Sequence, residues 1–181
     1  MKLLKVTITE KKIFPVNANK FVLIDYTHPT KYKKIFSAGG SHEFSSWKKF
    51  ATNPKFKIEL KNGDKDGLCT FVVSLHTKSA EKEKRLEKIG FGIFNFKSNE
   101  RLDGKFLKTN LVEKSGDSVE RLPQVTKRFE LKPGKYVIVP FTKRANQEGE
   151  FLLRIFSERK SDLKAIQVVK RRGLFNIKCI K

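Results

Sequence analysis

The amino-acid sequence predicts an all-β protein, an antiparallel sandwich built from more than eight short strands. Apolar and polar residues alternate with a period of two in one segment after another, which is typical of strands that bury one face. Most of the 16 phenylalanines fall inside these alternating segments. Helical patterns are scarce, because the best candidate, 79–88, has helix-forming residues but only Ala80 and Leu86 to form an apolar stripe. We expect that segment to be a solvated loop or a short surface helix.

The strongest strand prediction is 55–61, where phenylalanine, isoleucine and leucine share one face and charged residues occupy the other. Segments 68–77 and 90–97 are apolar on both faces, so we expect them to be inner strands. The remaining predicted strands are 3–9, 21–26, 125–131, 135–141, 150–157, 165–170 and 174–180.

The segment LKPGK at 131–135 carries the strongest turn signal in the chain. Proline fixes φ at the first turn position, and glycine tolerates the positive φ that the next position can need. We therefore expect a hairpin between 125–131 and 135–141. Strand alternation also predicts the core. Its expected members are Phe129, Leu131, Tyr136, Ile138, Phe151, Leu153 and Ile155, faced by Phe71, Val73, Phe91 and Ile93.

The charge of the chain limits its possible partners. Its 181 residues include 40 lysines and arginines against 19 aspartates and glutamates, a formal net charge of +21 at pH 7. A surface this cationic favours anionic partners. Cys69 and Cys179 are too few for a disulfide framework, and three histidines do not complete a zinc site with them. The sequence has no apolar run of transmembrane length, and a lysine interrupts the apolar residues at its start too early for the pattern to predict a signal peptide. We therefore expect an intracellular, cytoplasmic protein.

Four stretches carry a resemblance to a known family. They are SAGG at 37–40, Trp47 with TNPKF at 52–56, IGFGIF at 89–94, and RFELKPGKYVIVP at 128–140 with GEFLLRIFSE at 149–158. In this order and spacing they resemble the third domain of calpain large subunits, a C2-like β-sandwich that follows a cysteine protease core. The resemblance covers residues 35 to about 160. It implies a sandwich of about eight antiparallel strands, whose Pro-Gly hairpin and paired late strands are structural rather than catalytic.

The resemblance divides the chain into three expected parts. Residues 1–34 form an N-terminal extension with β structure packed on the domain, 35–162 form the C2-like sandwich, and 163–181 form a basic C-terminal extension. The glycine pairs Gly39–Gly40 and Gly90/Gly92 are interpreted as places of close backbone approach or as β-bulges.

Catalysis is not expected. The resemblance is to a non-catalytic domain, and a calpain protease core, with its Cys, His and Asn, takes several hundred residues that this sequence does not contain. Cys69 lies on a predicted inner strand, where burial disfavours a reactive thiolate. His28, His42 and His76 lack the spacing of a metal hydrolase motif, and no phosphate-binding loop motif is present.

Calcium is a minor alternative, and we otherwise expect no cofactor. Ca²⁺ takes six to eight oxygen ligands, whereas the candidate loop at 62–67 offers only the carboxylates Asp64 and Asp66, with a lysine between them. Asp103 and Asp117 could contribute only if the fold brings them close. The simpler interpretation is that Asp64 and Asp66 bond to their own backbone in turns.

The expected binding residues are cationic and lie on predicted loops and on the C-terminal extension. They are Lys48, Lys49, Lys82, Lys84, Arg85, Lys143, Arg144, Lys170, Arg171 and Arg172. The resemblance favours a docking module for anionic phospholipid or for an acidic protein surface. The alternative is a nucleic-acid-binding or structural component of a ribonucleoprotein or another large assembly. Motifs that read bases, such as an RNP-like aromatic pair or a GxxG clamp, are missing.

Overall fold

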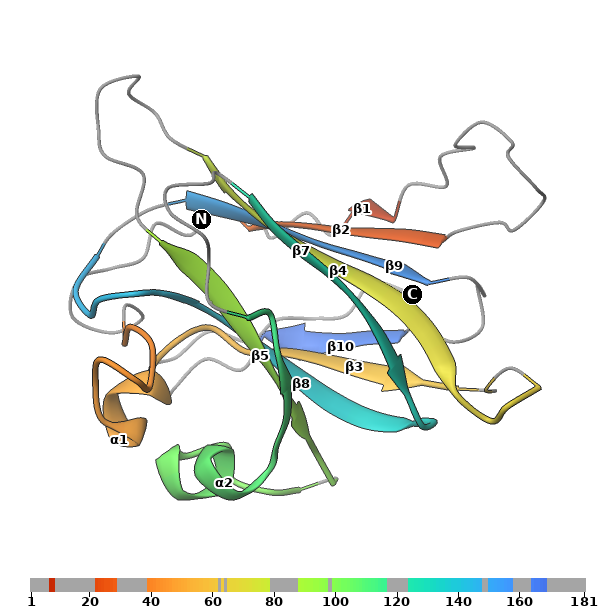
Figure 1. Cartoon of the computed structure of the whole chain (residues 1–181), viewed down its shortest axis with the longest axis horizontal. Coiled ribbons are helices and arrows are strands. Elements are labelled where there is room, and N and C mark those ends of the chain that lie inside the picture. The colour runs from red at the N-terminus through yellow and green to blue at the C-terminus, as the bar shows by residue number, and fades with distance from the viewer. Residues whose placement is uncertain are drawn as a thin grey trace.

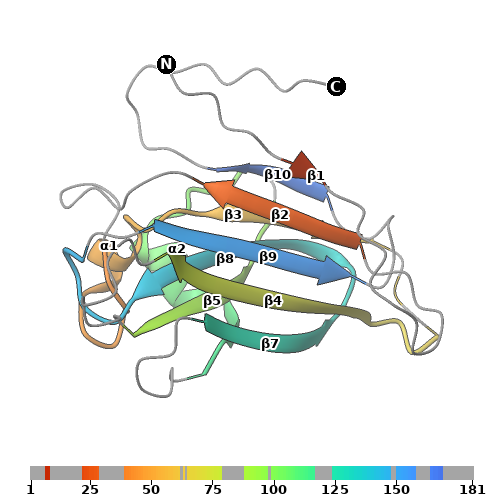
Figure 2. The ribbon, with the colours of Figure 1, turned by 90° about the horizontal axis from the view of Figure 1, so that it is seen from above.

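The computed structural model describes residues 7–8, 22–28, 39–61, 63, 65–78, 88–97, 99–116, 124–147, 150–157 and 164–168. Two five-stranded sheets pack face to face (Figure 1; Figure 2). In order across the sheet, sheet A contains β1 (Thr7–Ile8), β2 (Val22–His28), β9 (Glu150–Ser157), β4 (Cys69–Lys78) and β7 (Gln124–Leu131). Sheet B contains β10 (Lys164–Val168), β3 (Phe56–Leu60), β8 (Gly134–Thr142), β5 (Ile89–Asn95) and β6 (Leu111–Lys114). All neighbours pair antiparallel, which confirms the predicted all-β sandwich.

The predicted strands coincide with observed ones, except for the last. Segment 174–180 lies outside the described residues, as does 79–87, which makes up most of the predicted loop or helix. The sequence did not predict β6, whose four residues are all exposed. A strand without a buried face has no apolar alternation, so this edge strand left no period-two signal.

The predicted hairpin at Pro133 is wrong. β7 pairs with β4 in sheet A, whereas β8 pairs with β3 and β5 in sheet B, so the turn carries the chain from one sheet to the other. The turn is held by Tyr136, whose Oη donates a hydrogen bond to the carbonyl of Lys132 at 2.8 Å. Both strands have apolar inward faces, and placing one in each sheet lets these faces meet across the core. The expected pairing of the late strands is also wrong, because β9 lies between β2 and β4 in sheet A.

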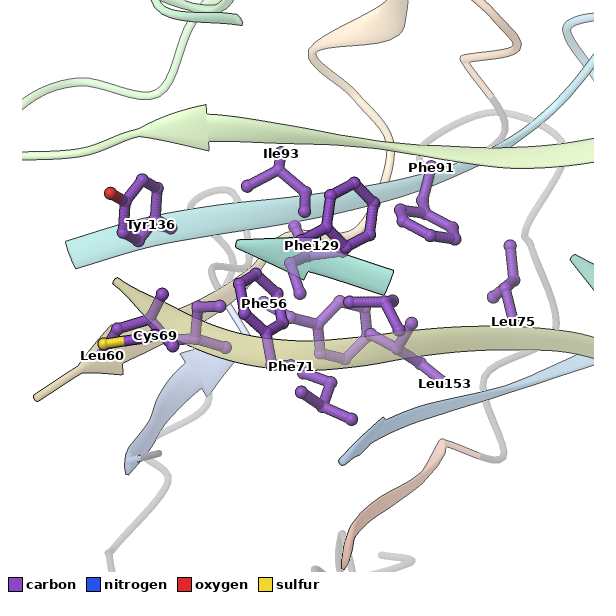
Figure 3. Packing of buried hydrophobic residues seen from close by; sticks show 14 of the residues in the cluster. Phe56, Leu60, Cys69, Phe71, Leu75, Phe91, Ile93, Phe129, Tyr136 and Leu153 are labelled. Carbon is purple, nitrogen blue, oxygen red and sulfur yellow. The ribbon is translucent and has the colours of Figure 1, made fainter. Parts of the chain in front are cut away.

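The main core fills the space between the sheets (Figure 3). The predicted core residues are buried there, apart from Leu131, which is partly buried at the margin. Aromatic rings pair within it. Phe71 and Phe129 are opposite each other on neighbouring strands of sheet A, with ring centroids 5.5 Å apart, and Phe91 of sheet B meets Phe129 across the core at 5.9 Å. Cys69 is 2% exposed at one end of this core, as predicted from its strand position.

A second apolar cluster lies on the outer face of sheet B and explains why β5 and β8 are apolar on both faces. Two short helices cover that face, α1 (Trp47–Phe50) and α2 (Gly104–Thr109). The cluster comprises Phe50, Phe94, Phe96, Leu107, Val137 and Val139, with Trp47, Ala51, Leu102, Phe106 and Phe141 packed against it. The sequence prediction contained neither helix.

The segments that flank the predicted domain contribute strands to both sheets. β2 pairs with β9 over seven residues, and β10 pairs with β3. The predicted boundaries at 34/35 and 162/163 stay predictions. Within the described part of the chain, no helix is long and apolar enough to span a bilayer.

Candidate anionic-surface site

Side chains cap both ends of helix α1, and the helix carries two exposed lysines. Ser46 Oγ accepts a hydrogen bond from the backbone N–H of Lys49 at 3.3 Å at the start of the helix. Past the end of the helix, the ammonium of Lys55 donates hydrogen bonds to the carbonyls of Ala51 and Asn53. The C-terminal end of a helix carries partial negative charge, which stabilises a cation there. Lys48 and Lys49 stay exposed on the surface of the helix.

Helix α2 is built in the same way from a distant part of the chain. The carboxylate of Asp103 accepts the backbone N–H of Phe106 at 3.0 Å and caps the helix. Leu107 is fully buried against sheet B, while Lys105 and Lys108 are exposed. These two lysines are three residues apart, so they lie on the same side of the helix.

Gly104 brings the two helices into backbone contact. A Cβ atom added at Gly104 would lie 2.7 Å from the carbonyl carbon and oxygen of Trp47 and 2.8 Å from the amide nitrogen of Lys48, closer than side chains approach backbone. The pair therefore packs as one layer on sheet B, seen as the orange and green helices in Figure 1. We call the two helices with their exposed lysines, Lys48, Lys49, Lys105 and Lys108, the helical layer.

The lysines of the helical layer lack the carboxylate partners that cations on the strands have. Among the described residues, no carboxylate forms an ion pair with Lys48, Lys49, Lys105 or Lys108. Several cations on the strands or directly after them are paired. Lys61 with Glu59, Lys114 with Glu43, Lys127 with Glu113, and Arg128 with Glu130 lie 2.9 to 3.9 Å apart. The positive charge of the helical layer is therefore left to attract an external anion.

A buried asparagine fixes the loop that leads into α1. Asn53 is 1% exposed; its Oδ1 accepts the N–H of Gly39 at 2.8 Å, and its Nδ2 donates to the carbonyl of Gly40 at 2.9 Å. Gly40 has φ of +72°, and a Cβ there would lie 2.5 Å from the backbone nitrogen of Ala145. Close backbone approach at the Gly39–Gly40 pair is thereby confirmed, and it places the loop against 143–145. At Gly90, by contrast, the space is taken by the ring of Phe141 rather than by backbone.

The tip of this loop combines an exposed aromatic ring with cations. Phe44 is 57% exposed, and the ammonium of Lys143 lies 4.5 Å from the centroid of its ring. The neighbouring Glu43 is paired with Lys114, at 2.9 Å between Nζ and Oε1. This hydrogen bond from Lys114 is the main cause that lowers the pKa of Glu43. Arg144 is exposed beside Lys143.

His42 packs behind the tip. Its ring stacks on Trp47 with centroids 4.3 Å apart, and its Nδ1 is buried without a hydrogen-bond partner among the described residues. Burial lowers the pKa of His42 below its ordinary value of 6.5, because the charged imidazolium would lose solvation there. Near neutral pH the imidazole is therefore neutral and packs as an aromatic ring against Trp47.

Four of the predicted site residues lie in two adjoining segments of the structure. Lys48 and Lys49 are on α1, and Lys143 and Arg144 are on the loop that packs against Gly40. The other predicted cations, Lys82, Lys84, Arg85, Lys170, Arg171 and Arg172, lie outside the described residues. Sequence reasoning missed Lys105 and Lys108. The signal for them was the capping residue Asp103, with Leu102 directly before it and Leu107 four residues after it, a pattern typical of a helix start.

The candidate calcium loop contains a backbone turn. The carboxylate of Asp66 accepts a hydrogen bond from the backbone N–H of Leu68 at 3.0 Å. This is the bond expected from the interpretation that Asp66 bonds to nearby backbone in a turn. Asp64 lies outside the described residues. Over the part of the chain that the structure describes, no three side chains of the metal-ligating types come together.

Comparisons with known proteins identify the domain. A family model described as "Calpain large subunit, domain III" matches residues 28–156. The calpain-2 catalytic subunit of Homo sapiens is 33% identical over 150 residues, covering 75% of this chain and 21% of the human protein. The calpain-2 catalytic subunit of Gallus gallus is 33% identical over 146 residues, covering 72% of this chain and 21% of the chicken protein. The match thus spans about a fifth of the length of these relatives.

Proposed function

The chain belongs to the calpain large-subunit domain III family, and from this premise we propose that it is a non-catalytic module that docks on an anionic surface. The proposed partner is an anionic phospholipid membrane or an acidic protein surface. The matched region is domain III, a small part of the proteins named catalytic subunits, so the proposal carries no protease activity over to this chain.

The observation that supports this proposal is the unpaired charge of the helical layer. Lys48, Lys49, Lys105 and Lys108 are exposed on two helices that Gly104 holds in contact, and none has a carboxylate partner among the described residues. A lysine close to an anionic membrane contributes about 1 kcal/mol of attraction. Four such residues on a fixed layer give about 4 kcal/mol at low salt, which is enough for reversible docking and is weakened by added salt.

Nucleic acid is less well supported by the same surface. Proteins that bind single strands stack bases on exposed aromatic rings. Among the residues whose side chains the structure describes, Phe44 is the sole exposed aromatic one. Of the phenylalanines on the strands, Phe156 is half-buried outside both cores, and the others pack in the two cores. Duplex DNA could bind through phosphate contacts alone, so the experiment described next includes it.

The test compares vesicles containing phosphatidylserine, neutral phosphatidylcholine vesicles, single-stranded RNA and duplex DNA, each at about 0.1 M and about 0.5 M salt. The full chain is expected to prefer the anionic vesicles, with binding that falls as salt rises. Reversing two charges in Lys105→Glu/Lys108→Glu should weaken that binding by at least about thirtyfold, since two attractions of about 1 kcal/mol each are lost. Lysine and glutamate have similar helix propensities, so α2 is expected to survive the change.

A matched control makes the same change of net charge elsewhere. Lys65 and Lys132 are exposed on the connections at the end of sheet B where Leu60 lies opposite Gly134, away from the helical layer. Lys65→Glu/Lys132→Glu should reduce vesicle binding only a few-fold through the overall charge. Equal losses in the two double variants would show that net charge, rather than the helical layer, drives docking. Tighter binding to RNA than to anionic vesicles at the higher salt would reject the proposal.

A further inference from the structure

We propose that Phe44 is a membrane anchor, whose ring enters the interface of an anionic lipid bilayer while neighbouring cations meet the headgroup phosphates. The inference rests on the proposed function. It specifies that the anionic surface is a lipid bilayer, because the exposed ring of Phe44 favours a bilayer over an acidic protein. Phe44 is 57% exposed, compared with 36% for Leu111 and 40% for Val112, the other large exposed apolar side chains among the described residues.

The exposure of Phe44 is fixed by a hydrogen-bonded turn. Ser45 Oγ donates to the carbonyls of Gly39 at 2.8 Å and Ser41 at 2.9 Å, and the N–H of Phe44 donates to the carbonyl of Ser41 at 3.2 Å. Before this turn in the chain, the two hydrogen bonds of Asn53 hold the backbone of Gly39 and Gly40. The ring is therefore presented to solvent by a preorganised loop, so binding does not have to supply the cost of ordering it.

The charges around the ring suit the headgroup layer of an anionic membrane. The ammonium of Lys143 lies 4.5 Å from the centre of the Phe44 ring, and the exposed Arg144 follows it in the chain. Glu43, the one carboxylate next to Phe44 in the sequence, is already neutralised by Lys114 at 2.9 Å. When the ring enters the apolar boundary, it would thus bring these cations to the level of the phosphates. The tip would bring no unpaired carboxylate there.

The aromatic ring is what favours a bilayer over an acidic protein surface. Carboxylates of a partner protein would satisfy Lys143 and Arg144 but would offer the exposed ring of Phe44 no apolar medium. A bilayer supplies both, phosphates at the surface and an apolar phase just below them, and aromatic side chains are favoured at that boundary.

The first experiment measures binding of the full chain and of Phe44→Ala to vesicles of phosphatidylserine and phosphatidylcholine and to single-stranded RNA. Phe44→Ala should weaken vesicle binding about tenfold, because most of an apolar side chain no longer enters the membrane. RNA binding should be unchanged, and Phe44→Leu should restore most of the vesicle affinity. The control Val112→Ala removes an exposed apolar side chain from the edge strand β6 and should leave vesicle binding unchanged.

The outcomes separate this inference from the proposed function. Vesicle binding that is the same for Phe44→Ala as for the unaltered chain overturns the anchor but leaves electrostatic docking in place. If the unaltered chain does not bind anionic vesicles at all, both the docking on lipid and the anchor are rejected. Equal weakening of RNA and vesicle binding by Phe44→Ala would also overturn the anchor, because the ring would then stack on bases.

A second measurement tests insertion directly. An environment-sensitive fluorophore on Phe44→Cys, in a Cys179→Ser background, reports the polarity at the tip; Cys69 is buried and should escape labelling. Addition of anionic vesicles should shift the emission to shorter wavelength. Unshifted emission under conditions where the labelled protein sediments with the vesicles would show that the tip stays in water, which refutes the anchor.

Discussion

Replacing the buried asparagine behind the loop should destabilise the whole domain. In Asn53→Ala, the N–H of Gly39 and the carbonyl of Gly40 lose partners at 2.8 and 2.9 Å, in a site where Asn53 itself is 1% exposed. A buried polar group left without a partner costs about 1–3 kcal/mol. For two such groups we expect a loss of about 2–6 kcal/mol in the free energy of unfolding.

Urea unfolding measures this loss, because the chain has a single tryptophan and it lies in the affected cluster at Trp47. For a domain of this size, each kcal/mol shifts Tm by about 2–4 °C, so thermal unfolding should also resolve the change. The control Asn95→Ala alters an exposed asparagine at the end of β5 and should stay within about 0.5 kcal/mol of the unaltered chain. If Asn53→Ala is equally mild, the two hydrogen bonds do not fix the loop and the reasoning fails.

Three other predictions follow from single contacts. Gly104→Ala places a Cβ 2.7 Å from the carbonyl of Trp47 and should cost about 1–3 kcal/mol of stability in thermal unfolding; a neutral result would mean that the helices are not packed backbone to backbone. His42 has a folded-state pKa below its ordinary 6.5, so the unfolded chain takes up the proton first and stability should fall as pH drops below that value. Denaturation at several pH values should show this fall for the unaltered chain and a shallower one for His42→Phe; identical profiles would contradict it. Asp66→Ala should lower the free energy of unfolding by about 1 kcal/mol, because it removes the acceptor of the Leu68 N–H. Calorimetric titration of the unaltered chain should show no Ca²⁺ binding. Tight Ca²⁺ binding that Asp66→Ala abolishes would instead make the loop a calcium site.

The strands were predictable because their burial is periodic. In β3, buried residues alternate with half-buried ones along the whole strand, and this is the pattern that a sequence displays directly. The hairpin prediction failed because a Pro-Gly turn specifies only a local reversal of the chain. Whether the next strand pairs in the same sheet or crosses to the other is decided by which apolar faces meet, as those of Phe129 and Tyr136 do in the core.

The candidate site was predictable only in part, because charge is visible in a sequence but grouping is not. The adjacent Lys48 and Lys49 stand out as a pair, whereas Lys105 and Lys108 join them only through the contact at Gly104. Both helices are one or two turns long, too short for a helical moment to emerge from the pattern. Two clues were available: the capping residue Asp103, and the segment 90–97, which is apolar on both faces and therefore needs a second layer to cover its outer face.

The crossing at Pro133 has a consequence for the kinetics of folding. β7, β8 and β9 alternate between sheet A and sheet B, and the partners of β4 are β7 and β9, both far downstream of it. Neither sheet can be assembled from one continuous stretch of chain. Loop closure over long separations must therefore precede most of the stabilising pairing, so refolding should be slow, in milliseconds to seconds, and cooperative rather than stepwise.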